Sequence, residues 1–249
     1  MCLARHLDTQ KPNVAGFSVD QNPVKSVHRR REPKYVQILS QNTRGFNDEK
    51  EEMVLALMQQ KNIFAYAVQE TWKRGDALYE KYGFLVIQHG SDVQPSKSHP
   101  SGGVAIILSP DARKAWIAAG SSVSHFGNRI LAIKLELLDA NQKPVTVVLV
   151  SAYAPIGAAK EAIRQEFATE LERCMDAPKS NEVLLILVCI NPNTSMGVRS
   201  QADRNNQVLG PFGVNYVNDA GRALFDLLDS KGICSAATFF EKPAYAALA

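Results

Sequence analysis

The segment LVCINPNTSMG, residues 187–197, places polar side chains directly after a run of aliphatic residues. This pattern predicts a buried strand that delivers side chains into a loop, as at the edge of an active site. The loop residues that could take part in chemistry are the amides Asn191 and Asn193. Metal-dependent chemistry would need a carboxylate there, because hard divalent cations prefer carboxylate oxygens. The spacing therefore indicates a site edge whose residues carry no charge.

Polar residues follow other predicted strands in the same way. Asn42 lies in SQNTRGF, Glu70 lies in VQET, and Tyr153 lies in VSAYAP. Because α/β proteins place their chemistry where the ends of core strands meet, we expect these three residues to share one rim with the loop after residue 188. Each residue also has a structural interpretation on its own, as an exposed carboxylate, a turn former or an interface aromatic.

The elements that must position these residues follow from hydrophobic periodicity. Strands are predicted at 35–40, 63–68, 84–88, 103–108, 129–138, 145–151, 182–188 and 233–240. The first helix is predicted at 47–60, with Asp48 as its N-cap and Glu51 as the capping-box partner. Two further helices are predicted around Ile163–Cys174 and at about 219–230. Their order predicts one α/β domain with several hairpins.

Charge and composition limit the class of protein. Residues 1–34 hold seven Lys/Arg and three Asp/Glu, so this segment carries a charge of +4. The rest of the chain carries −1, which gives the net charge of +3. We predict a basic, disordered leader at 1–34 and a folded domain at 35–249. Four scattered cysteines, no secretory signal and no apolar run that could span a membrane indicate a protein of the nucleus or cytoplasm.

The order of these motifs resembles the endonuclease/exonuclease/phosphatase superfamily over about residues 35–249. The strongest likeness is to the endonuclease domains of LINE-type retrotransposons, which are relatives of abasic-site endonucleases. The segment LGPFGVNYVNDAGRALFDLLDSKGI (209–233), before a TFF strand, is similar to those domains in particular. The resemblance implies a four-layer α/β sandwich of two mixed sheets flanked by helices, and Mg²⁺-dependent hydrolysis of phosphodiester bonds in DNA.

The resemblance also implies roles for single residues. Glu70 matches the metal-binding glutamate, Asn42 matches an asparagine that helps to hold the acidic site, and Tyr153 matches a tyrosine that contacts the scissile phosphate. Residues 190–193 align with the Gly-Asp-Phe-Asn tetrad, so that Asn193 is retained and Asn191 replaces the aspartate that activates water. An amide cannot accept that proton near neutral pH.

Two further departures from the family weaken the expected site. The closing Ser-Asp-His motif and its strands are absent, so we expect a fold that is incomplete at its C-terminal end, an open sheet edge and an unstable monomer. Arg44 lies where some relatives carry an acidic residue. We therefore expect weak Mg²⁺ binding at Glu70, because Mg²⁺ gives up its waters reluctantly.

Three hypotheses about function follow. The chain is a retroelement endonuclease-like domain with little or no activity, or a non-catalytic module that binds nucleic acid or another phosphate group. The third hypothesis is a working phosphodiesterase in which Asp203 or His125 replaces the missing groups. Gly127–Ile130 could lie along a nucleic-acid groove, with a solvated turn as the alternative.

Overall fold

A computed structural model describes the backbone of residues 2–5, 35–91, 102–155, 159–189, 195–199 and 207–241. The strands are β1 (Cys2–Arg5), β2 (Ile38–Asn42), β3 (Ala65–Gln69), β4 (Ala77–Lys81), β5 (Phe84–His89), β6 (Val104–Leu108), β7 (Val123–Phe126), β8 (Ile130–Leu138), β9 (Pro144–Tyr153), β10 (Val183–Cys189) and β11 (Ile233–Ser235). The helices are α1 (Asp48–Lys61), α2 (Pro110–Ala118), α3 (Glu161–Asp176) and α4 (Asp219–Ser230), followed by a 3₁₀ turn at Ala236–Thr238.

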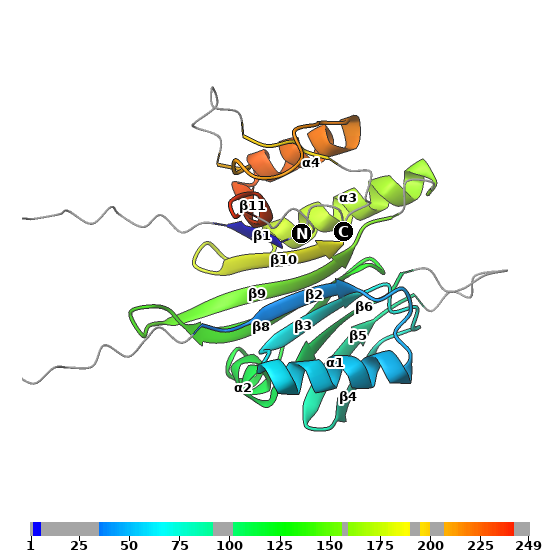
Figure 1. Cartoon of the computed structure of the whole chain (residues 1–249), viewed down its shortest axis with the longest axis vertical. Coiled ribbons are helices and arrows are strands. Elements are labelled where there is room, and N and C mark those ends of the chain that lie inside the picture. Colours follow the sequence, from blue (N-terminus) through cyan, green and yellow to red (C-terminus); the bar gives the residue numbers. More distant parts are fainter. Residues whose placement is uncertain are drawn as a thin grey trace, which may run out of the picture.

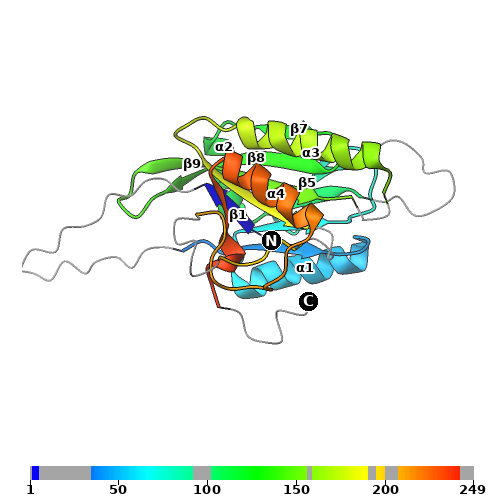
Figure 2. The same ribbon diagram turned by 90° about the horizontal axis from the view of Figure 1, so that it is seen from above.

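The strands form two mixed sheets that pack face to face. The five-stranded sheet has the order β2-β3-β6-β5-β4, and the six-stranded sheet has the order β11-β1-β10-β9-β8-β7. Each sheet contains one parallel pair, β2 with β3 and β9 with β10, among antiparallel neighbours. Helix α1 covers one side of the molecule, and α3 and α4 cover the opposite side (Figures 1 and 2). The predicted α/β sandwich of two mixed sheets and flanking helices is confirmed.

Alternation along the strands explains this layering. In β8, Leu131, Ile133 and Leu135 face the core between the two sheets, whereas Ile130 and Ala132 face the core beneath α3 and α4. A third cluster joins α1 to the outer face of the five-stranded sheet. Strand β10 buries side chains on both faces, as its continuous apolar sequence predicts.

Strand β1 corrects the expectation that residues 1–34 form a leader outside the folded domain. Cys2–Arg5 pairs antiparallel with β10 on one side and with β11 on the other, so these four residues are not part of a leader. Residues 6–34 connect β1 to β2 and lie outside the described residues, and disorder there stays a prediction. The expected open edge does not fall at β10, because β1 supplies the main-chain hydrogen bonds that a buried strand requires.

Two local predictions about element ends are wrong. The N-cap of α1 is Asn47, whose side chain accepts a hydrogen bond from the backbone N–H of Lys50. Glu51 caps nothing, because its buried carboxylate contacts Lys73 at 3.3 Å and the Tyr79 hydroxyl at 3.0 Å. The predicted strand at 233–240 ends at Ser235, where the chain turns into the 3₁₀ segment.

Candidate active site

The two parallel pairs bring four strand ends to one rim. Strands β2 and β3 end at Asn42 and Gln69, which are paired in register, and β9 and β10 end at the paired residues Tyr153 and Cys189. The antiparallel strand β6 starts at this rim, since its first residue, Val104, pairs with Gln69. The carboxyl ends of neighbouring parallel strands therefore form the edge on which the sequence analysis places the site.

Asn42 joins the two sheets at this rim. Its side-chain amide donates to Glu70 Oε1 at 2.6 Å and to Cys189 Sγ at 3.3 Å. Its side-chain oxygen accepts the backbone N–H of Arg44 at 3.0 Å. With both ends of the amide engaged, Asn42 holds the Glu70 carboxylate in a fixed position, which is the positioning that the sequence resemblance implies for this asparagine.

Tyr153 and Arg129 complete the cluster around Glu70. Tyr153 is buried, and burial together with the hydrogen bond to Glu70 raises the pKa of its hydroxyl, which therefore stays protonated at neutral pH. The guanidinium carbon of Arg129 lies 5.2 Å from the centre of the Tyr153 ring, in a cation–π arrangement. Burial lowers the pKa of Arg129, but an arginine side chain stays a cation at neutral pH.

The loops that carry Asn42 and Glu70 adopt backbone conformations that are rare for residues other than glycine. Arg44, Glu70 and Trp72 have φ values of +46°, +53° and +56°. Such residues cost of order 1–3 kcal/mol each, and they tend to occur where the surroundings determine a functional conformation. Here the two loops hold each other, since the backbone N–H of Gly45 donates to the Glu70 carbonyl at 2.7 Å.

Lys50 fixes the loop after β2 from the side of helix α1. Its ammonium group donates to the carbonyls of Thr43, Arg44 and Gly45 at 2.7, 3.1 and 3.0 Å. Three charge-assisted hydrogen bonds from one side chain hold this strained loop in a single conformation. Lys50 therefore supports the position of Asn42 without touching it.

A buried polar network ties the sheets together behind the rim. The Gln69 side-chain amide donates to Ser151 Oγ and to Ser40 Oγ, both at 3.1 Å, and the Ser151 hydroxyl donates to the Val68 carbonyl at 3.2 Å. Gln69 and Ser151 are at most 1% exposed. Buried polar groups are costly unless they are paired. This network therefore fixes the position of β3 in one sheet relative to β9 in the other, and hence the spacing of Glu70 and Tyr153.

The structure therefore brings together three of the five predicted site residues, Asn42, Glu70 and Tyr153. Asn191 and Asn193 lie outside the described residues, as does Asp203. Among the described residues the chain reaches the cluster at Cys189, two positions before Asn191 in the sequence. His125 lies in a different group, where it contacts Asp76 at 3.3 Å and stacks on His89.

Sequence reasoning did not identify Arg129, Lys50 or Cys189 as members of this site. Arg129 was noted only as part of a segment that could line a groove, and a signal was available, because it is the first residue of the predicted strand at 129–138. Lys50 looked like an ordinary exposed helix residue. The roles of Lys50 and Cys189 depend on contacts between residues that are distant in sequence, which no local pattern shows.

Glu70 is the carboxylate of this cluster that could contribute to a Mg²⁺ site. Within the described ranges, Glu70 belongs to no group of three or more possible metal ligands. Its carboxylate accepts hydrogen bonds from Asn42 and Tyr153, and it interacts electrostatically with the cation Arg129. A divalent cation placed here would meet one negative charge that these groups already partly balance, whereas Mg²⁺ binds through carboxylates and substrate phosphates.

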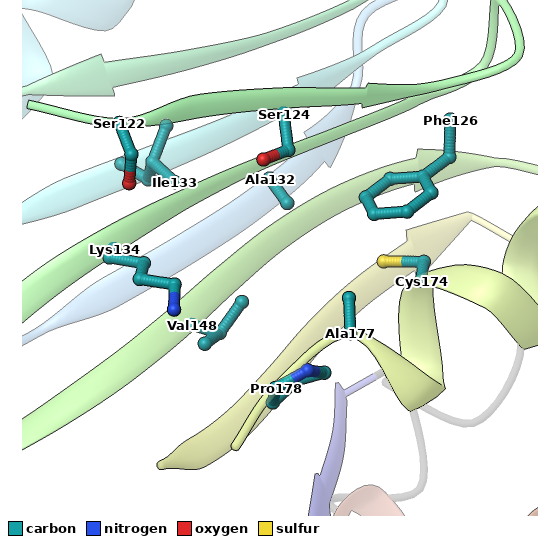
Figure 3. A pocket seen from close by; sticks show the side chains of 10 residues that line it. All are labelled: Ser122, Ser124, Phe126, Ala132, Ile133, Lys134, Val148, Cys174, Ala177 and Pro178. Carbon is teal, nitrogen blue, oxygen red and sulfur yellow. The ribbon is translucent and has the colours of Figure 1, made fainter.

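A small pocket elsewhere in the molecule is too narrow for a substrate. It lies between the six-stranded sheet and the end of α3, and its volume is about 30 Å³ (Figure 3). That volume corresponds to roughly one water molecule. The side chains shown around it are Ser122, Ser124, Phe126, Ala132, Ile133, Lys134, Val148, Cys174, Ala177 and Pro178.

Comparison with solved structures supports the fold. The catalytic domain of Xenopus laevis APE2 matches with a TM-score of 0.52 and 15% identity, over 77% of this chain and 67% of that one. This likeness shows that the two proteins share the two-sheet α/β sandwich fold. An AP endonuclease from Archaeoglobus fulgidus is also similar, with a TM-score of 0.47 and 17% identity over 79% of this chain and 71% of that one. At these identities the likeness concerns the fold alone.

The sequence has no match among protein families or curated proteins. Among the described helices, none combines the length and the apolar character needed to cross a membrane.

Proposed function

We propose that this chain is an endonuclease-like domain, derived from a LINE-type retroelement, in which Mg²⁺-dependent hydrolysis of phosphodiester bonds is strongly impaired. The observation that carries the proposal is the environment of Glu70. This single carboxylate is held by the neutral groups of Asn42 and Tyr153 and lies near the cation Arg129. The retroelement origin rests on the order of sequence motifs over about residues 35–249.

The chemistry available to these residues favours binding a phosphate over cleaving its ester. Arg129 can pair with phosphate oxygens, and the protonated Tyr153 hydroxyl can donate to one of them. Glu70 offers a single carboxylate, for which we propose weak Mg²⁺ binding. The alignment of residues 190–193 that the resemblance implies places the amide of Asn191 where a water molecule must lose a proton. The site then lacks a general base, a group typically worth about 10²- to 10⁴-fold in rate.

We expect the purified chain to nick supercoiled plasmid DNA in Mg²⁺ no faster than its Glu70→Gln variant does. The reason is that one carboxylate without a general base contributes little to catalysis. The measurement is the rate of open-circle formation by both proteins, with EDTA added as the zero-rate control. Mg²⁺-dependent nicking that is at least about tenfold faster than that of Glu70→Gln would contradict the impairment.

A second candidate function, a non-catalytic module that binds DNA through its phosphates, is favoured by one feature of Arg129. Its Nη1 atom is buried and has no hydrogen-bond partner among the residues that the structure describes. Buried guanidinium nitrogens are normally satisfied, so an unpaired one beside a Tyr–Glu cluster fits an anionic group supplied by a ligand. Binding and weak hydrolysis would use the same rim, and the two functions differ only in turnover.

Replacing Arg129 by glutamine is therefore expected to weaken binding of a DNA duplex and to reduce the slope of log affinity against log salt by about one. Fluorescence anisotropy at several salt concentrations measures both quantities. Arg113→Gln is the matched control, because this substitution removes the same charge at a position outside the Glu70 cluster. Arg113 lies in α2 and pairs with Glu80 at 2.6 Å. Equal losses in the two variants would mean that Arg129 acts only through net charge.

A further inference from the structure

A second group of possible ligands, separate from Glu70, joins the β4–β5 side of the five-stranded sheet to the edge strand β7 of the six-stranded sheet. Asp76 precedes β4, His89 ends β5, and His125 lies in β7. Asp76 Oδ1 is 2.6 Å from His89 Nδ1, and Asp76 Oδ2 is 3.3 Å from His125 Nδ1. One ligand atom from each residue lies within 4.8 Å of the others, and this is the one group of three such residues found in the described part of the chain.

The far nitrogen of His89 determines what its near nitrogen can do. His89 Nε2 lies 2.7 Å from the carbonyl oxygen of Gly127, which can only accept a hydrogen bond, so Nε2 carries a proton. In the neutral ring Nδ1 then presents a lone pair toward the Asp76 carboxylate at 2.6 Å. That contact is repulsive unless a second proton lies between the two atoms, or unless they move apart around a metal ion. A histidine that donates its other N–H to a backbone carbonyl is the usual arrangement of a metal ligand.

The second histidine is oriented by stacking. The rings of His89 and His125 are 4.2 Å apart with an angle of 4° between their planes, and both Nδ1 atoms face Asp76. The side chains of His89, His125 and Asp76 are 10%, 33% and 55% exposed, so the group is closed toward the core and open to solvent at the carboxylate.

We propose that Asp76, His89 and His125 form a binding site for a divalent transition-metal ion, with Zn²⁺ as the expected occupant. Two imidazoles, one carboxylate and a water molecule make a tetrahedral N₂O₂ set, which suits Zn²⁺. Bonds of about 2.0–2.2 Å separate tetrahedral ligand atoms by about 3.4 Å, so His89 Nδ1 and Asp76 Oδ1, which lie 2.6 Å apart, would move apart by about 0.8 Å when the ion binds. The ion would clip β5 of the five-stranded sheet to β7 of the six-stranded sheet, and this role is independent of phosphodiester hydrolysis.

The test is titration of the full chain, first stripped with a chelator, with Zn²⁺ in a calorimeter and with Co²⁺ in a spectrophotometer. We expect one ion per chain and a dissociation constant that rises about 100-fold or more in His125→Asn and in Asp76→Asn. With free Zn²⁺ about 100-fold above the dissociation constant, the Tm should rise by roughly 5–10 °C in the natural chain and not in these variants.

Two controls make the result specific to this group. Glu70→Gln should bind Zn²⁺ as the natural chain does, and so should His28→Asn, which removes a histidine from another part of the sequence. The Co²⁺ complex should show weak visible bands of nitrogen and oxygen ligands without an intense thiolate charge-transfer band. Absence of stoichiometric binding to the natural chain, unchanged affinity in both ligand variants, or a thiolate band would each overturn the proposal.

Discussion

Replacing Asn191 by aspartate is expected to raise Mg²⁺-dependent nicking of supercoiled plasmid by about 10²-fold or more. The change adds a carboxylate that can accept a proton from water, two residues after Cys189. Cys189 Sγ lies 3.3 Å from the Asn42 amide, which in turn holds Glu70. A second carboxylate would also add the negative charge that a Mg²⁺ site needs. Initial rates of open-circle formation at saturating Mg²⁺ measure the gain.

The matched control is Asn193→Asp, which makes the same chemical change two positions later. Only position 191 aligns with the family's aspartate, so Asn193→Asp should leave the rate near that of the natural chain. Adding Glu70→Gln to Asn191→Asp should remove the gain, because both carboxylates are needed. A gain of equal size from both aspartates would show that added charge, and not position 191, is responsible.

Gly103→Ala is expected to lower the free energy of unfolding by about 3–4 kcal/mol. Gly103 has φ +79°, and an added Cβ would lie 2.3 Å from Thr71 Oγ1 and 3.1 Å from the Lys73 carbonyl. The positive φ costs an alanine roughly 1–2 kcal/mol, and the overpacking adds about 1–3 kcal/mol. The backbone N–H of Thr71 also donates to the Gly103 carbonyl at 3.1 Å, so the strain falls directly on the loop that carries Glu70.

Gly83→Ala separates the two contributions to that loss. Gly83 has almost the same φ, +81°, but no atom lies within 4 Å of its added Cβ. It should therefore lose only the conformational part, about 1–2 kcal/mol, because open space removes the clash. Urea denaturation of both variants against the natural chain gives the difference directly. Losses that agree within about 0.5 kcal/mol would contradict the close packing of Gly103 on Thr71.

Much of the secondary structure could be predicted because its signals are local. The alternation of Leu131, Ile133 and Leu135 predicted strand β8, and the apolar run at 183–189 predicted the buried strand β10. Strands β4 and β7 were missed, since both are short and no residue in either strand is fully buried. Helix α2 was missed although Ser109 caps it and Pro110 starts it, which is a recognisable sequence signal.

Three residues of the candidate site could be predicted from the order of the strands. Asn42, Glu70 and Tyr153 end predicted strands, and strand ends in α/β folds meet at one edge, so their proximity follows from order and topology. The Asp76–His89–His125 group could not be predicted in this way. Its members come from two sheets, and neither the spacing of 13 residues between Asp76 and His89 nor that of 36 residues between His89 and His125 is a metal-binding motif.

The sequence by itself determined the residue types of this protein, namely one carboxylate at the rim, amides at 191 and 193, and the apolar periodicities that build two sheets. Only the tertiary structure decided the partners of those residues: Asn42 against Cys189, Arg129 over Tyr153, and strand β1 beside β10. The physical reason is the separation along the sequence of the residues that interact. Periodicity and caps act over one or two turns of chain, whereas these contacts join residues up to 185 positions apart, such as Cys2 and Leu187, and depend on how the sheets pack.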